Sequence, residues 1–168
     1  MAQRELYVRY GPAMFAVCCR YVADRSVAED LLHDGFITLY TKIGDFRGEG
    51  SFEGWCRRIF VTTALGYLRK RNPLAFSDPL EDARSLSVEG GDALERMSGQ
   101  ELLHCIEALP EGYRTILNLY AVEGYSHKEI GQMLGVSENT SRSQYSRARS
   151  RLMEMIRDRN RIKLKDKA

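Results

Sequence analysis

The side chains of this sequence that are best suited to a chemical role are basic, and they gather in two blocks. Five basic residues and no acidic one lie from Arg57 to Arg71, and ten basic residues stand against four acidic ones from Ser137 to Ala168. Between the blocks, residues 75–98 hold six acidic and two basic residues. Two positive blocks separated by a negative stretch indicate two contacts with a polyanion such as nucleic acid. Charge alone fits equally well with solvated helix surfaces that bind nothing.

The residues that commonly hold metals or act as nucleophiles do not form a site in this sequence. The cysteines contain no CxxC pair, and the histidines have no ligand spacing with them. We therefore expect no metal, no cofactor and reduced thiols. No nucleophile, paired carboxylate or phosphate-binding loop accompanies the first histidine, so we expect no enzymatic activity. These residues are Cys18, Cys19, Cys56, Cys105, His33, His104 and His127.

Apolar residues recur at helical spacing almost throughout the chain, and strand patterns are nearly absent. Hydrophobic residues make up 43% of the 168 residues, which is enough for packed cores in two small domains. We therefore predict an all-α fold of two small helical domains joined by a flexible acidic linker. The sequence shows no signal peptide and no apolar run of about 20 residues. This predicts a cytoplasmic protein without direct membrane insertion.

Turn and capping residues organise the first domain, which is predicted over residues 1–74. Its first helix contains the pair 11–12, Gly-Pro, where a bend or a break is expected. A capping box formed by Ser26 and Glu29 is predicted to start the second helix. The stretch 44–50 has three glycines in seven residues and is predicted to be a loop before a third helix.

Residues 75–97 form the predicted acidic linker, and a second domain is predicted over 98–158, followed by a basic tail at 159–168. The strongest local pattern of this domain runs from Ser126 to Leu152. A capped short helix, a turn at Gly135 and a longer basic helix are typical of a helix-turn-helix. The last helix has the basic outer face that a recognition helix needs in the major groove.

Two groups of segments resemble the two conserved regions of one protein family. The first group resembles region 2 of the sigma-70 family: residues 28–40 (AEDLLHDGFITLY), 45–55 (DFRGEGSFEGW), 58–59 (RI) and 64–71 (ALGYLRKR). The second group resembles region 4: residues 109–114 (LPEGYR), 124–131 (GYSHKEIG) and 136–149 (VSENTSRSQYSRAR). On these residues the chain is identified as a member of the small extracytoplasmic-function (ECF) group of that family.

The resemblance implies the function of an ECF sigma factor. Such a protein directs core RNA polymerase to specific promoters and assists strand opening. The expected partners are core RNA polymerase, promoter DNA and an anti-sigma factor, which in this family can be membrane-anchored. The first domain would bind the −10 element and polymerase, and the second would read the −35 element as duplex.

The resemblance also implies site residues, in three sets. The face expected to dock on polymerase consists of Glu29, Asp30, His33 and Asp34. The −10 contacts are expected from Phe46, Arg47, Arg57, Arg58, Arg69, Lys70 and Arg71. The −35 contacts are expected from Ser126, His127, Lys128, Thr140, Arg142, Ser143, Gln144, Arg147 and Arg149. Within the last set, we expect Arg142, Ser143 and Arg147 to contact or approach bases, and Thr140, Gln144 and Arg149 to contact phosphate.

Plainer interpretations stand beside these roles. The polar face of the second helix is also what an ordinary solvated helix presents. The loop 45–51 is expected to capture an unstacked base with Phe46 as a stacking surface, but it also fits a simple helix connection with Phe46 in the core. Trp55 fits the core better than a stacking role. His127 and Lys128, at a helix start, suit phosphate better than a base.

Three positions depart from the usual pattern of the family. Gly35 lies in the middle of a helix, where it costs about 1 kcal/mol relative to alanine. Ser141 replaces a customary valine, so the recognition helix is expected to pack less tightly. The segment 60–62 (FVT) replaces a more polar stretch, which bears on the contact with the upstream strand.

Two other functions remain open on the sequence. A conventional helix-turn-helix regulator with an N-terminal sensor domain would dimerise and bind a palindrome without polymerase. An interaction protein that sequesters a partner, such as an anti-sigma or adaptor protein, would not need arginines that face bases.

Overall fold

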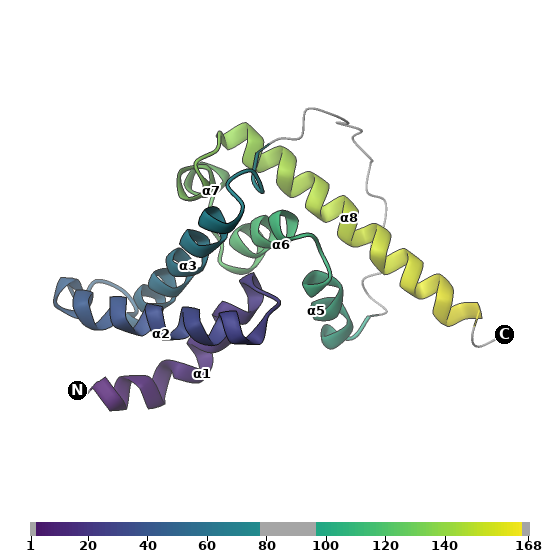
Figure 1. Ribbon diagram of the computed structural model, residues 1–168. Coiled ribbons are helices and arrows are strands. Elements are labelled where there is room, and N and C mark those ends of the chain that lie inside the picture. Colours follow the sequence, from purple (N-terminus) through teal and green to yellow (C-terminus); the bar gives the residue numbers. More distant parts are fainter. Residues whose placement is uncertain (1–2, 78–96, 166–168) are drawn as a thin grey trace. The chain divides into compact units, whose positions relative to one another are not determined.

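The computed structural model describes residues 3–77 and 97–165, which form two compact units, Met1–Ala75 and Phe76–Ala168. Every regular element of the described residues is helical (Figure 1), which confirms the predicted all-α class. The predicted linker falls almost wholly outside these residues. No helix in the described ranges is long and apolar enough to cross a membrane.

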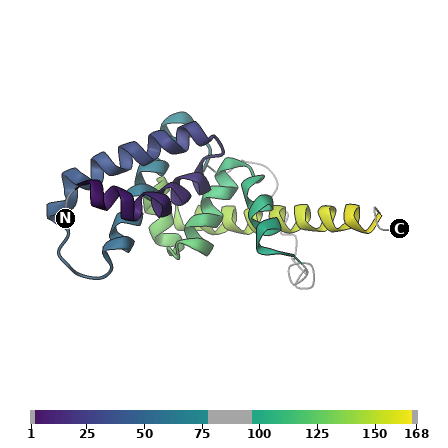
Figure 2. The same cartoon turned by 90° about the horizontal axis from the view of Figure 1, so that it is seen from below.

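The first unit is a packed set of three helices, α1 (Gln3–Tyr21), α2 (Arg25–Lys42) and α3 (Phe52–Arg71), with a 3-10 turn η1 (Ile43–Asp45) after α2. Each of the three helices contacts the other two, and Figure 2 shows α1 and α2 side by side. Their shared core is almost free of solvent. Its largest fully buried side chains are Met14, Val17, Tyr21, Leu39, Phe60, Val61, Leu65 and Leu68.

The first helix continues through Pro12 as a single helix, so the split that the Gly-Pro pair allowed does not occur. Proline removes one backbone donor from a helix interior. Packing of α1 against both α2 and α3 offsets that loss, because Met14 and Val17 just after Pro12 are 0% exposed.

The second helix begins at Arg25 and is capped by Asp24, so the predicted capping box of Ser26 and Glu29 is wrong. The Asp24 carboxylate accepts hydrogen bonds from the backbone N–H groups of Ser26 (2.8 Å) and Val27 (3.3 Å). A carboxylate suits the positive end of the helix dipole better than a hydroxyl, and it begins the helix before Ser26. Glu29 pairs instead with Arg25, at 3.2 Å.

The mid-helix Gly35 has a packing explanation in the Phe60 side chain. A Cβ atom added at Gly35 would lie 2.3 Å from the Phe60 ring, closer than any real contact. Phe60 is 0% exposed and meets the Phe36 ring edge to face, with centroids 5.1 Å apart. The Phe60 ring therefore fills the space that a side chain at position 35 would occupy.

The second unit contains α5 (Gly99–Glu107), α6 (Glu111–Leu117), a π-helical turn η2 (Asn118–Val122), α7 (His127–Leu134) and α8 (Glu138–Lys165). The helix α8 contacts α5, α6 and α7. Its buried side includes Ala148, Leu152, Met153 and Ile156. Residues 159–165, predicted as part of a separate basic tail, continue α8 without interruption.

Candidate nucleic-acid interface

The helix-turn-helix of the second unit is built by capping and by one close approach of backbone. The capping box of Ser126 and Glu129 starts α7. Gly135 ends it in the left-handed conformation, at φ 70° and ψ 33°, which glycine adopts without strain. A Cβ atom on Gly131 would lie 2.7 Å from the carbonyl oxygen of Val136. Glycine at this position therefore allows α7 and the start of α8 to meet through their backbones.

The N-terminal half of α8 carries exposed basic side chains opposite a buried stripe. Arg142 and Arg149 are exposed, and Ser143 and Arg147 are half-buried. The Arg142 guanidinium makes a salt bridge with the Glu138 carboxylate one turn earlier. Ser137 caps this helix, because its Oγ accepts from the N–H of Thr140 at 3.0 Å. The helix thus presents cationic side chains at the end that a recognition helix inserts into DNA.

Gln144 does not lie on that exposed face, contrary to its expected role as a phosphate contact. Its side chain is 5% exposed. Its amide nitrogen donates to the carbonyl oxygen of Ser77, 3.3 Å away. The sequence missed this burial because Ser77 is 67 residues distant. A phosphate contact by Gln144 is not available in this conformation.

The His127 side chain makes contacts within the protein that a residue serving only to bind phosphate would not need. Its Nδ1 lies 2.9 Å from the Oγ of Ser141, and its ring stacks on Tyr120 with centroids 4.3 Å apart and planes 11° apart. Burial, together with the charge of Arg142, lowers the pKa of the imidazole. Lys128, the next residue, is exposed.

Ser141, expected to weaken the packing of the recognition helix, has a specific partner in the structure. The residue is 0% exposed, and its hydroxyl is paired with His127. The packing lost with the valine side chain is replaced by a hydrogen bond between α7 and α8.

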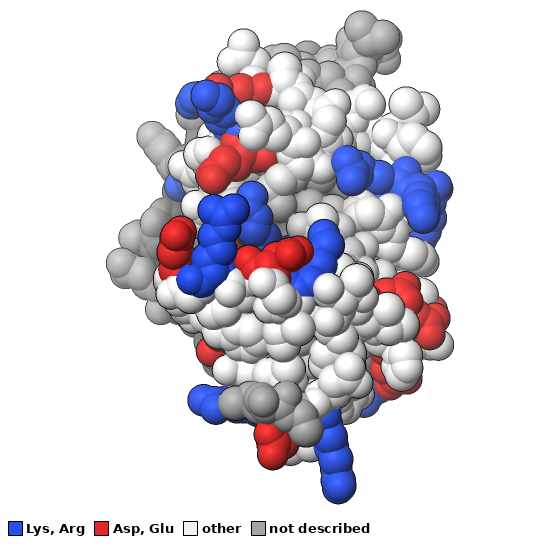
Figure 3. Space-filling view, turned by 90° about the vertical axis from the view of Figure 1, so that its left-hand side faces the viewer, with Lys and Arg blue, Asp and Glu red and all other residues white. Residues whose placement is uncertain are grey.

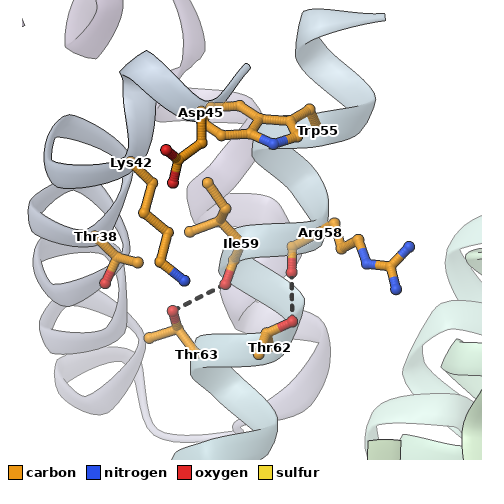
Figure 4. A pocket seen from close by; sticks show the side chains of 8 residues that line it. All are labelled: Thr38, Lys42, Asp45, Trp55, Arg58, Ile59, Thr62 and Thr63. Carbon is orange, nitrogen blue, oxygen red and sulfur yellow. Dashed lines mark hydrogen bonds between the residues drawn. The ribbon is translucent and has the colours of Figure 1, made fainter. Parts of the chain in front are cut away.

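The first unit has a cavity of about 300 Å³ between the end of α2, η1 and α3. Figure 4 shows the side chains of Lys42 and Ile59 directed into it, Trp55 above it and the Arg58 guanidinium extending away. Two of its lining side chains are held in place by hydrogen bonds, since the Thr62 and Thr63 hydroxyls each donate to a backbone carbonyl one helical turn earlier. The full lining is Thr38, Lys42, Asp45, Trp55, Arg58, Ile59, Thr62 and Thr63.

Most of this lining was not identified from the sequence. Only Arg58 was among the named contact residues and only Asp45 belonged to the loop expected to capture a base, because the other side chains come from segments that meet only in the fold. Thr62 and Thr63 carry a weak sequence signal, because each places a hydroxyl one helical turn after Arg58 or Ile59.

The loop beside this cavity is organised by aromatic packing. Phe46 lies against Phe52 (ring centroids 5.2 Å apart) and Trp55 (5.4 Å), and it is half-buried. The plainer interpretation of Phe46 as a packed residue thus describes this structure better than a free stacking surface. Trp55 is likewise half-buried. Gly48 and Gly50 have φ of 75° and 79°, so these two glycines are what lets the loop turn.

The other expected −10 residues lie along the surface of α3 and its preceding loop. Arg47, Arg58 and the terminal basic residues 69–71 are exposed, and Arg57 is half-buried near Glu53 (3.8 Å). Basic side chains are interspersed with acidic ones on the face drawn in Figure 3, so neither sign of charge forms a continuous patch there. The terminal cluster 69–71 concentrates positive charge at the C-terminal end of α3.

The polar face of α2 is open to solvent as expected. The side chains of Glu29, Asp30, His33 and Asp34 are all exposed. The next turn adds Ile37, which is 58% exposed, so the face combines charge with an apolar contact. Sequence reasoning did not include this isoleucine, whose exposure depends on how α2 packs.

These features together define a two-domain helical DNA-binding protein of transcription. Residues 6–73 match sigma-70 region 2, and residues 99–152 match sigma-70 region 4. The chain therefore belongs to the sigma-70 family, and within it to the ECF group. Its function is that of an ECF sigma factor, which directs RNA polymerase to promoters.

Curated relatives and solved structures agree with this assignment. The ECF RNA polymerase sigma-E factor of Escherichia coli is 32% identical over 155 residues, covering 86% of this chain and 81% of that protein. The RNA polymerase sigma-H factor of Pseudomonas aeruginosa is 32% identical over 157 residues, covering 86% and 80%.

The fold also resembles two structures solved as complexes. One is the sigma factor RpoE of Bartonella quintana with the anti-sigma factor NepR, at 21% identity and a TM-score of 0.57, covering 92% of this chain and 96% of that one. The other is CnrH with the cytosolic domain of CnrY, at 20% identity and a TM-score of 0.51, covering 93% and 88%.

Proposed function

We propose that the predicted second domain, residues 98–158, reads the −35 element through the N-terminal half of α8. The observation that carries this is the capped helix-turn-helix whose outer face bears Arg142, Ser143 and Arg147. Arginine can bind guanine through two hydrogen bonds in the major groove. The surrounding groups that we assign to phosphate are Ser126, His127, Lys128, Thr140 and Arg149, with Gln144 removed from the expected set.

His127 can take part in this contact through one nitrogen only. Its Nδ1 is committed to Ser141, which leaves Nε2 for a phosphate oxygen. Lys128 is exposed at the same helix start, where backbone N–H groups and the helix dipole favour an anion.

For the predicted first domain, residues 1–74, we propose binding of the −10 element as single strand. The cavity beside the loop 45–51 has a volume at the lower end of ordinary ligand pockets, which suits a single flipped base. The Thr38 and Thr62 hydroxyls provide polar edges, and Trp55 provides a flat apolar wall. Arg47, Arg57, Arg58 and residues 69–71 are assigned to the phosphates.

The partners that we propose are core RNA polymerase and an anti-sigma factor, besides promoter DNA. The face of α2 from Glu29 to Asp34 is exposed and is assigned to polymerase. The solved structures of RpoE with NepR and of CnrH with CnrY support an anti-sigma partner by analogy. We further propose that the chain acts in the cytoplasm and catalyses no reaction itself, as expected of a factor that redirects another enzyme.

In vitro transcription with purified core polymerase and genomic promoter fragments tests the assignment. The full chain should produce discrete transcripts that core polymerase alone does not produce. Footprints should cover a −35 and a −10 element only when polymerase is present. A footprint over a palindrome without polymerase would support a conventional regulator instead. Tight binding to another sigma factor with no transcripts would support a sequestering protein.

A further inference from the structure

One polar contact in the helix-turn-helix joins the start of α7 to α8. Ser141 is a buried hydroxyl in a stripe of α8 that continues with Ala148, Leu152 and Ile156. A buried hydroxyl needs a hydrogen-bond partner, because leaving it without one is costly. That partner is the Nδ1 atom of His127, 2.9 Å away at the start of α7.

The imidazole of His127 is fixed on its other sides by aromatic rings. It stacks almost parallel on Tyr120 of η2, and it also meets Tyr145 of α8, with centroids 5.7 Å apart. Tyr120 and Tyr145 touch each other, with centroids 4.5 Å apart. The ring belongs to α7 and contacts both η2 and α8.

This contact is the second of two anchors along one face of α7. Gly131 lies four residues after His127, hence on the same face and about 6 Å further along the helix axis. There the backbone meets the Val136 carbonyl so closely that no Cβ fits. One anchor would leave α8 free to pivot against α7, whereas two anchors set the crossing angle of the two helices.

The position of the second anchor gives it a bearing on DNA reading. Ser141 is the direct neighbour of Arg142, whose side chain points to the exposed side while Ser141 points inward. A shift of the α8 backbone at Ser141 moves the arginine with it. Directional contacts to base edges tolerate such shifts far less than contacts to phosphates do.

We propose that His127 is a positioning residue for the recognition helix, acting through its hydrogen bond to Ser141 and its stack on Tyr120. It sets the placement of Arg142 against the −35 bases, besides any contact that its free nitrogen makes with phosphate. The proposal rests on the proposed function, since it assumes that α8 reads the −35 duplex.

The test uses the full chain with core polymerase and promoters that differ by single −35 base pairs. His127→Phe keeps a stacking ring and removes the hydrogen bond, and Ser141→Ala removes the other partner. Each should lower discrimination among the −35 variants by about 3- to 10-fold, the range expected for one hydrogen bond. The double variant should lose no more than the worse single variant. His127→Asn, which places a polar atom near the Nδ1 position but loses the ring that stacks on Tyr120, should recover the discrimination only in part.

Matched controls and a second measurement separate this role from plain stability. His104→Phe and Ser150→Ala change the same residue types elsewhere in the second unit and should leave discrimination unchanged. Urea unfolding of the same variants should show the same non-additivity at positions 127 and 141. Additive effects in both measurements would overturn the proposal. So would an equal loss of affinity for all DNA with discrimination intact, because that is what a merely structural role predicts.

Failure of the proposed function would look different. The wild-type holoenzyme would then show no preference among −35 variants. The urea measurement would still decide whether His127 and Ser141 are coupled.

Discussion

At the scale of single residues, two departures from the expected sequence pattern, at Gly35 and Ser141, are each explained by a partner in the fold. Gly35 is explained by Phe60, whose ring occupies the space of a side chain at position 35. Ser141 is explained by His127, which satisfies its hydroxyl. Either departure looks unfavourable when taken alone. Each unusual residue could be recognised in the sequence, but its partner could not, because the partners lie 25 and 14 positions away and meet only through packing.

The first pair predicts a mutational cycle. Gly35→Ala should destabilise the first unit by about 1–3 kcal/mol, because the new methyl overlaps a buried ring. Phe60→Ala should also destabilise it, through the cavity left behind, by about 3–5 kcal/mol. The double variant should be less destabilised than the sum, since the added methyl then enters vacated space. Urea unfolding of the full chain measures all three changes.

A second glycine provides the control for this cycle. Gly66 lies inside α3 with no atom within 4 Å of an added Cβ. Gly66→Ala should therefore be neutral or stabilising, by up to about 1 kcal/mol, because alanine favours the helix. Destabilisation by both alanines alike would mean that the Phe60 ring is not what excludes a side chain at position 35.

Arg142 carries the prediction on base reading. Arg142→Ala should cost about 1–3 kcal/mol on the preferred −35 element and relax specificity there. The salt bridge to Glu138 does not protect the residue from this test, since both side chains are largely exposed and such pairs are weak. Arg161→Ala, at the far end of α8, is the matched loss of charge and should leave specificity unchanged. Full selectivity in the Arg142 variant would remove this side chain from the base contacts.

At the scale of elements, local sequence signals predicted the start of a helix correctly where only one candidate capping residue was present. The capping box of Ser126 and Glu129 formed as its sequence predicts, since both partners lie within one turn. The start of α2 was predicted wrongly because a stronger acceptor, Asp24, stands just before Ser26. The cavity of the first unit could not be predicted at all. Its walls come from residues 38–45 and 55–63, and no local pattern brings those segments together.

The contact between α5 and the end of α8 predicts a dependence of stability on acid. Lys163 of α8 bonds to the Glu101 carboxylate at the start of α5. That bond, followed by the hydrogen bonds from Ser98, lowers the pKa of Glu101 from 4.5 to about 2. The folded state thus binds this proton less readily than the unfolded state does. The stabilisation is complete above pH 4.5 and is lost as the pH falls toward 2.

Acid titration of unfolding measures this contribution. Glu101→Gln should remove part of the decline in stability between pH 4.5 and 2, while Glu107→Gln, on the same helix, serves as the control. High salt should reduce the difference between the wild type and Glu101→Gln, because the carboxylate is accessible to solvent. Identical acid profiles for the wild type and the Glu101 variant would show that Lys163 does not hold this carboxylate in solution.

At the scale of the whole molecule, the composition of the chain and the order of its motifs already predicted the two-domain organisation. Two helical domains of sigma-70 type follow from motifs that appear in the correct order along the chain, and the family matches cover both. The acidic segment between them lies outside the described residues. Its role must therefore be argued from its charge, which is −4 over residues 75–98 from six acidic and two basic residues.

The negative charge offers a way to distinguish a segment that binds polymerase from one that only joins the two domains. A spacer needs only length and flexibility, so replacing its charges should change nothing. The resemblance to sigma-70 proteins implies that a linker at this position threads the polymerase channel that later holds template and nascent RNA. Such a channel must be basic to hold nucleic acid, so an acidic peptide can occupy it by the same electrostatics. Growing RNA must then displace the peptide, which connects early transcription to sigma release.

Neutralising the segment tests this directly. Replacing Asp78, Glu81, Asp82, Glu89, Asp92 and Glu95 with Ser and Gln should weaken binding to core polymerase and alter the yield and length of abortive RNA. A variant with the same residues in scrambled order keeps the charge and should behave like the wild type, because the electrostatic argument depends on net charge rather than on sequence. Preference among −35 variants should be unchanged in both, since the recognition helix is not altered. Unchanged core affinity and unchanged abortive RNA after neutralisation would reduce the segment to a tether. Loss of function in the scrambled variant would instead indicate specific contacts, which net charge alone does not predict.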